Sequence, residues 1–215
     1  MHIPLPFCVL AFATIGASFS AYVHFDRLLL TYVGILLALC LGAYSLDELH
    51  GRPYHTKFSD RTLWALAIIG ITGGGLVGAY LILSVNALIA IPAVLALFFI
   101  PVYNLELFGG RFHNAWWFGI SWGGLTTFAG YFVQSVGFSV PVLIMSVMAS
   151  VIGVSIVSLT HKFRPDELRR KLETAQSGDL IAFSRYARKT AWVIAQMECY
   201  AMMMLAAAVI IPKIH

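Results

Sequence analysis

Long apolar runs separated by polar segments set the pattern of this chain. The runs do not alternate apolar with polar residues, so they are typical of membrane-spanning helices and not of barrel strands. Only helices and closed barrels satisfy their backbone hydrogen bonds in hydrocarbon. The sequence therefore predicts an all-α fold, a polytopic transmembrane bundle of about seven spans that forms a single domain over residues 1–215. The expected spans are 6–24, 28–46, 63–83, 86–103, 114–134, 138–160 and 190–211.

Composition agrees with lipid as the solvent. Hydrophobic residues make up 60% of the chain and charged residues only 11%, whereas a soluble domain carries about 25% charged residues. The basic residues border the spans and form no recognised motif, which argues against nucleic acid as a partner. Cys8, Cys40 and Cys199 lie in apolar runs without a pairing pattern, so we expect them to act as small hydrophobic side chains.

The charges are distributed unequally between the two sides of the predicted bundle. Three polar loops, 47–62, 104–113 and 161–189, share a side with the N-terminus if the chain has seven spans. That side then holds twelve of the 14 Lys and Arg residues, and only Arg27 and Lys213 lie opposite. The positive-inside rule predicts a multi-pass integral membrane protein with its N-terminus and long polar loops in the cytoplasm and its C-terminus outside.

Glycines recur at four-residue spacing within two predicted spans. Gly70, Gly74 and Gly78 lie on the third span, and Gly119 and Gly123 lie on the fifth. Such stripes allow helix backbones to approach closely in lipid. Room for a bulky ligand is the alternative interpretation.

The last polar segment, 161–189, is predicted to be a helical cytoplasmic loop. Pro165 suits the start of a short helix, and Gly178 suits its end. The amphipathic stretch 180–192 is expected to lie along the membrane interface before the last span begins. Glu198 lies inside that span, where an acid is a functional candidate, although it could also be protonated or reach the interface.

Residues 43–60, AYSLDELHGRPYHTKFSD, combine the groups best suited to chemistry. Asp47 and His50 are three residues apart at the end of a helix, so they share one face. A break after His50 brings His55 and Asp60 back toward the same opening. A carboxylate with imidazoles suits Zn²⁺, Mn²⁺ or Fe²⁺, and carboxylates with a phosphate partner suit Mg²⁺. A solvated polar loop without a ligand is the alternative.

This segment resembles the first motif of the UbiA superfamily of intramembrane prenyltransferases, N-D-x-x-D-x-x-x-D followed by R-P. Asp47 and Glu48, then Gly51-Arg52-Pro53 and Thr56, are similar to it at the end of the second span. Tyr103 in PVYNLELFGG, followed by Arg111, resembles the family's tyrosine-then-basic segment, and residues 118–137 read like the family's fifth span. The second acidic motif of the family has its counterpart near 158–170.

The resemblance implies a UbiA-like enzyme that transfers a polyprenyl group from its diphosphate to a lipid or aromatic acceptor. Its partners would be the polyprenyl diphosphate or another isoprenoid lipid, together with membrane lipids, and its cofactor would be Mg²⁺, with Mn²⁺ or another divalent metal as the alternative. Phe118, Phe128 and Tyr131 would line the cavity for the chain. The implied site has Asp47, Tyr103 and Asp166 in catalysis, Asp47, His50, His161 and Asp166 on the metal, and Arg52, Arg111, Lys162 and Arg164 on the diphosphate.

Other interpretations remain open at this point. A non-catalytic protein of the same fold would bind an isoprenoid, quinone or anionic lipid, with a membrane-protein partner in a larger complex. A metal-dependent enzyme would use His50, His55, His113 and His161. A transporter is disfavoured because only Glu198 marks the middle of the membrane and no internal repeat is evident.

Overall fold

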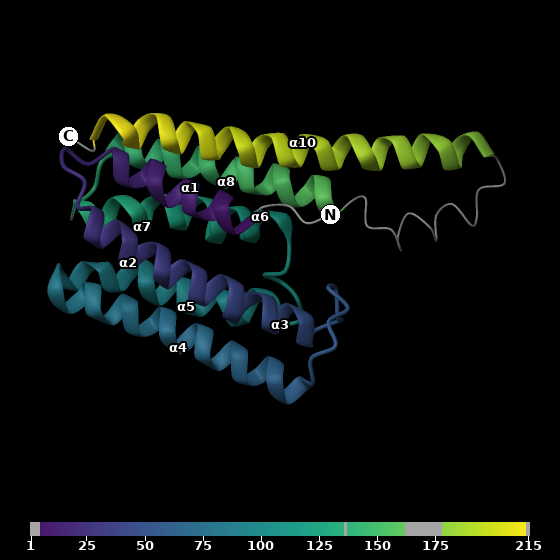
Figure 1. Cartoon of the computed structure of the whole chain (residues 1–215), viewed down its shortest axis with the longest axis horizontal. Coiled ribbons are helices and arrows are strands. Elements are labelled where there is room, and N and C mark those ends of the chain that lie inside the picture. The colour runs from purple at the N-terminus through teal and green to yellow at the C-terminus, as the bar shows by residue number, and fades with distance from the viewer. Residues whose placement is uncertain (1–4, 136, 162–177, 214–215) are drawn as a thin grey trace.

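The computed structural model describes residues 5–135, 137–161 and 178–213, and every regular element in these ranges is a helix. Over the described ranges the helices join end to end into seven rods, which lie at the sequence positions of the predicted spans (Figure 1). The rods are α1 (Leu5–Ser18), α2 (Phe25–Leu36) with η1 (Leu37–Ala43) and α3 (Tyr44–Leu49), α4 (Asp60–Ser84), η2 (Ala87–Ile89) with α5 (Ala90–Asn104), α6 (Ala115–Phe118) with η3 (Gly119–Gly124) and α7 (Leu125–Gln134), α8 (Val140–His161), and α10 (Gly178–Ile210) with η4 (Ile211–Lys213).

Within the described residues, five helical stretches are long and apolar enough to cross a membrane: Phe25–Leu49, Asp60–Ser84, Ala87–Asn104, Val140–Leu159 and Lys189–Lys213. Large apolar side chains cover their outer faces, as Ile68, Leu76 and Leu83 do on α4. A water-soluble fold would bury such residues, so this number of long apolar helices indicates a membrane protein. The first predicted span is shorter than expected, because α1 ends at Ser18 and not at residue 24.

The rods form two groups that pack against each other (Figure 1). In one group α1 contacts α7 and α10, and α8 packs on α10 and η3. In the other group α4 packs on α2, η1 and α5. α1, α2, α5 and α7 connect the two groups.

Both described polar loops, 50–59 and 105–114, lie at the same end of the bundle, which we call the mouth end (Figure 1). α8 ends and α10 begins toward this end as well, whereas the C-terminal end of α10 lies at the opposite end. The first two loops therefore share one end, as the sequence predicts. The side of the membrane that this end faces stays a prediction.

Small residues mark the closest helix contacts. A Cβ on Gly70 would overlap the backbone N of Gly42, and a Cβ on Gly119 or Gly123 would overlap backbone oxygens of α8. A Cβ on Gly16 of α1 would overlap the backbone of α7 in the same way. Close packing at these glycines is thus confirmed, and it fixes the spacing between rods.

The stretch 180–192 does not form a separate interfacial helix. α10 is a single helix of 33 residues that begins at Gly178 and passes through this stretch into the last span. The sequence explains the continuity, since no Gly or Pro interrupts it between Gly178 and Pro212. The helix is about 50 Å long and projects past the other rods at the mouth end (Figure 1). The short helix predicted from Pro165 lies outside the described residues.

Candidate functional site

The mouth loop after α3 is built around the side chain of Glu48. This carboxylate is 1% exposed and accepts the backbone N–H of Tyr54 at 2.8 Å and of Thr56 at 2.6 Å. The backbone curls around it with left-handed conformations at Gly51 (φ 100°) and Arg52 (φ 53°). Glu48 therefore fixes the shape of the loop, and both of its carboxylate oxygens already accept hydrogen bonds from loop residues.

Asp47, the neighbouring acid, occupies a different environment. It is half-buried, and its Oδ2 accepts the hydroxyl of Tyr54 at 3.0 Å. The Tyr54 ring packs on Tyr44 with ring centroids 5.5 Å apart. Asp47 is thus held at the rim of the bundle, next to the loop and beside the end of α3.

Arg52, predicted to bind a diphosphate, makes contacts within its own loop. Its guanidinium donates to the carbonyl oxygen of Phe58 at 2.8 Å and pairs with Asp60 at the start of α4. Both side chains are exposed to solvent. Asp60 thus returns to the loop that follows His50 and pairs there with Arg52, while its approach to Asp47 and His50 stays a prediction.

A chain of polar contacts links the two mouth loops. Glu106 lies 3.6 Å from Nε2 of His50 and 3.7 Å from Nε2 of His113. The other ring nitrogen of His113 is 2.9 Å from the carbonyl oxygen of Tyr103. The rings of Tyr103 and His113 stack with centroids 4.7 Å apart. Tyr103 itself is 5% exposed, so the aromatic part of this contact is buried.

Glu106 did not emerge from sequence reasoning as a site residue. It adopts φ 50°, an unfavourable conformation for a residue with a Cβ. The available signal was a single acid inside the short aromatic segment 103–113. Such a signal cannot show that the loop would meet His50, because that contact joins residues far apart in the chain.

The remaining predicted site residues are only partly described. Arg111 is exposed, and its carbonyl oxygen accepts a hydrogen bond from Asn114 at 3.0 Å. His161 ends α8, but its side chain lies outside the described part of the structure. Lys162, Arg164 and Asp166 also lie outside the described residues.

Over the described ranges, no group of three or more His, Cys, Asp or Glu side chains is arranged to hold a metal ion. Mg²⁺ ordinarily needs fewer protein ligands, because one or two carboxylates act with substrate phosphates and water. Glu48 does not fit this role, since hydrogen bonds from the loop already occupy its oxygens, and Asp47 stays the predicted ligand of the first motif.

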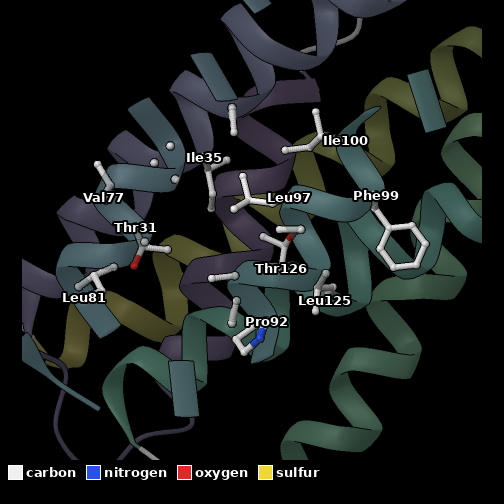
Figure 2. A pocket seen from close by; sticks show the side chains of 18 of the residues that line it. Thr31, Ile35, Val77, Leu81, Pro92, Leu97, Phe99, Ile100, Leu125 and Thr126 are labelled. Carbon is white, nitrogen blue, oxygen red and sulfur yellow. The ribbon is translucent and has the colours of Figure 1, made fainter. Parts of the chain in front are cut away.

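An apolar cleft with a cavity volume of about 150 Å³ lies between the helices (Figure 2). Side chains of α2, η1, α4, α5, η3 and α7 surround it. Ile35, Leu97 and Leu125 are typical of its walls, and the π-helical segments η1 and η3 contribute Ala38 and Trp122. π-Helical turns frequently occur at functional sites.

The glycines of α4 differ in whether they make tight helix contacts or line the cleft. A Cβ on Gly74 would lie 3.0 Å from Cβ of Ala38, a tight contact with η1. A Cβ on Gly75 would find Leu97 at 3.8 Å, and one on Gly78 would find Ala93 at 3.6 Å, both ordinary contacts. Gly74, Gly75 and Gly78 all line the cleft. Gly74 therefore both packs tightly and lines the cleft, whereas Gly75 and Gly78 line the cleft without a tight contact.

One end of the cleft approaches the mouth. Phe99 and Ile100 line it, and Tyr103 follows Ile100 by one turn of α5. The ring of Phe99 packs against Trp117 at 5.4 Å and against Phe112 of the second mouth loop at 6.3 Å between centroids. Aromatic rings thus connect the cleft with the polar end of the bundle.

Phe118, Phe128 and Tyr131, which were expected to line a cavity for the chain, do not line this cleft. Phe118 packs against Tyr103 and Val157, and Phe128 packs in a separate cluster near Leu81. These aromatic side chains fill contacts between helices, so they do not line the cleft. The residues of this rod that do line it are Ser121, Trp122, Leu125, Thr126, Ala129 and Val133.

Glu198 lies away from the cleft, on α10. Its Oε1 accepts the hydroxyl of Ser155 on α8 at 2.8 Å. Its Oε2 is buried and has no hydrogen-bond partner among the described residues. The side chain thus joins α8 to α10 and does not line the cleft.

Comparisons of the chain with protein-family models, with curated proteins and with solved structures give no significant match.

Proposed function

We propose that this chain is a UbiA-like integral membrane prenyltransferase. It takes the hydrocarbon chain of a polyprenyl diphosphate into the cleft and transfers the prenyl group to a lipid or aromatic acceptor at the mouth. The observation that carries the proposal is an apolar cleft whose end lies one helical turn from Tyr103 and the polar mouth loops. The resemblance of residues 47–56 to the first UbiA motif supports the same assignment.

The cleft suits the hydrocarbon part of such a substrate. Its lining is almost wholly apolar, and burial of an apolar chain gains roughly 25 cal/mol for each Å² removed from water. The aromatic rings of Phe99 and Trp122 lie at the end nearest the mouth. Faces of aromatic rings stabilise cations, so they would favour the carbocation that forms when the allylic carbon–oxygen bond breaks.

The mouth end carries the polar groups that would bind the diphosphate of the substrate. Asp47 is the described carboxylate assigned to the metal, and Asp166 is the predicted second one. Mg²⁺, when bound, neutralises charge on the diphosphate. Arg111, Lys162 and Arg164 are assigned to the developing negative charge of the leaving group. In this proposal the mouth end faces the cytoplasm, in agreement with the distribution of Lys and Arg.

A second candidate is a non-catalytic protein of the same fold that binds an isoprenoid or another lipid. One specific observation favours it: the Glu48 carboxylate is used by the loop, which leaves fewer acids for a metal–diphosphate site. Both candidate functions place a lipid chain in the cleft, but only the prenyltransferase converts it to a product.

Diphosphate release separates these candidates. The purified protein is incubated with a labelled polyprenyl diphosphate, Mg²⁺ and a membrane lipid extract as the source of acceptor, and both labelled product and inorganic diphosphate are measured. Transfer is expected for the wild type and for Asp60→Ala, an exposed acid of the same region, but not for Asp47→Ala or after chelation of Mg²⁺. Chain binding without product in the wild type would establish the second candidate and reject the first.

A further inference from the structure

The end of the cleft away from the mouth is closed. Leu81, Ile89 and Val133 line this end and are only 3–4% exposed. They form one packed cluster with Phe132, which is 1% exposed. A chain that enters near Ile100 would therefore meet a wall of packed side chains at this end.

The distance between the two ends limits the length of a bound chain. Ile89 and Ile100 are eleven residues apart along η2 and α5, which corresponds to about 16 Å of helix. An extended backbone covers about 3.5 Å in three bonds, so an isoprene unit, with four bonds along the chain, covers about 4.7 Å by the same geometry. The cleft accordingly has room for about three units.

The hydroxyl groups in the cleft walls already donate their protons within the bundle. The hydroxyl of Thr31 donates to the carbonyl oxygen of Arg27 at 2.8 Å, and that of Ser121 donates to Trp117 at 2.7 Å. The hydroxyl of Thr126 donates to the carbonyl oxygen of Ser121 at 3.4 Å. A carbonyl in the middle of a bound chain would lose its hydrogen bonds from water, and these hydroxyls have no further proton to donate to it.

We infer that the cleft selects an unfunctionalised isoprenoid chain of about three units, with Leu81, Ile89 and Val133 as the residues that set the length limit. This inference rests on the proposed function, because it specifies the substrate of the same cleft. It assigns the limit to a part of the bundle remote from the mouth loops.

Competition between isoprenoid alcohols tests the length limit. The full-length protein in detergent is mixed with equal amounts of alcohols of two, three, four and six isoprene units, and bound species are quantified by native mass spectrometry. We expect about tenfold preference for the three-unit alcohol over the six-unit alcohol. A three-unit chain with a mid-chain carbonyl should bind about tenfold more weakly than its unmodified counterpart.

Substitutions at the closed end should move the preference. Leu81→Ala removes part of the wall and should shift the optimum to four units, whereas Leu83→Ala, at an 88% exposed position of the same helix, should leave it unchanged. Val133→Met extends a side chain into the cleft and should shift the optimum to two units, which provides a second test if Leu81→Ala does not fold.

The possible results distinguish failure of the length limit from failure of the proposed function. Equal binding of all chain lengths, or an unchanged optimum in a folded Leu81→Ala or Val133→Met protein, would reject the length limit and leave chain binding intact. Absence of binding for every alcohol would reject the proposed function itself, together with this inference.

Discussion

Oε1 of Glu48 accepts both the backbone N–H of Thr56, at 2.6 Å, and its hydroxyl, at 2.9 Å. The carboxylate belongs to the last turn of α3, whereas Thr56 lies in the mouth loop. A side chain at the end of a spanning rod therefore fixes the shape of the loop that follows it. The position of Asp47 relative to Tyr54 depends on the same arrangement.

Removal of this carboxylate should destabilise the mouth. Glu48→Ala leaves the N–H groups of Tyr54 and Thr56 without their acceptor, so we expect a loss of about 2 kcal/mol in the free energy of unfolding. Asp60→Ala removes an exposed carboxylate and should cost about 1 kcal/mol or less. Thermal unfolding of both variants in detergent measures the difference. Equal melting temperatures would show that Glu48 does not organise the loop.

Two glycines of α4 should respond oppositely to the same substitution. Gly70→Ala places a Cβ against the backbone of Gly42 and Leu37, and we expect it to cost about 1–3 kcal/mol. Gly78→Ala meets only an ordinary contact at 3.6 Å, and the better helix propensity of Ala should stabilise by up to about 1 kcal/mol. Unfolding in detergent compares the variants. A similar loss in both would contradict the division of the stripe into packing and cleft residues.

Asp47 should be needed for transfer but not for binding of the chain. Asp47→Asn keeps the size of the side chain and removes its charge, so we expect prenyl transfer to fall by about 10²-fold or more. Tyr54→Phe removes the hydroxyl that donates to Oδ2 but keeps the Asp47 carboxylate, so it should have a much smaller effect. Product formation measures the first quantity, and native mass spectrometry measures occupancy of the cleft. Full transfer by Asp47→Asn would exclude this residue from catalysis.

The mouth loops should face the cytoplasm. In a variant without Cys8, Cys40 and Cys199, a single cysteine is placed at His55 or Phe108 in the mouth loops, or at Tyr22 near the opposite end. Tyr22 is 81% exposed and Phe108 is 68% exposed, so each position is accessible to reagent. A membrane-impermeant maleimide should label Tyr22→Cys from outside intact cells, and the other two only in inside-out vesicles. Labelling of His55→Cys and Phe108→Cys from opposite sides would rule out a common mouth.

Five of the rods could be predicted as spans because each is a long apolar run, and hydrophobicity alone defines such a run. Their ends were harder to predict, since the sequence alone does not show where packing ends a helix. α1 ends early at Ser18, and α10 continues without a break through residues expected at the interface. α10 stays continuous because no Gly or Pro interrupts the helix between Gly178 and Pro212.

The site was predictable only where its contacts are local. The turn after His50 and the return of Asp60 follow from the sequence of the loop. The contact of Glu106 with His50 joins two distant segments, and nothing in either segment specifies it. The cleft was equally hidden, because Gly74 and Gly75 look alike in sequence and differ only in the helix that each one faces.

Binding of a three-unit isoprenoid alcohol to cleft variants is the most direct test of the central claim, that the apolar cleft holds the prenyl chain. Gly78→Leu fills the cleft, and Ala79→Leu adds the same side chain at the neighbouring exposed position of α4. Native mass spectrometry should show that Gly78→Leu loses about tenfold or more in affinity and that Ala79→Leu binds like the wild type. Undiminished binding by a folded Gly78→Leu protein would contradict the account.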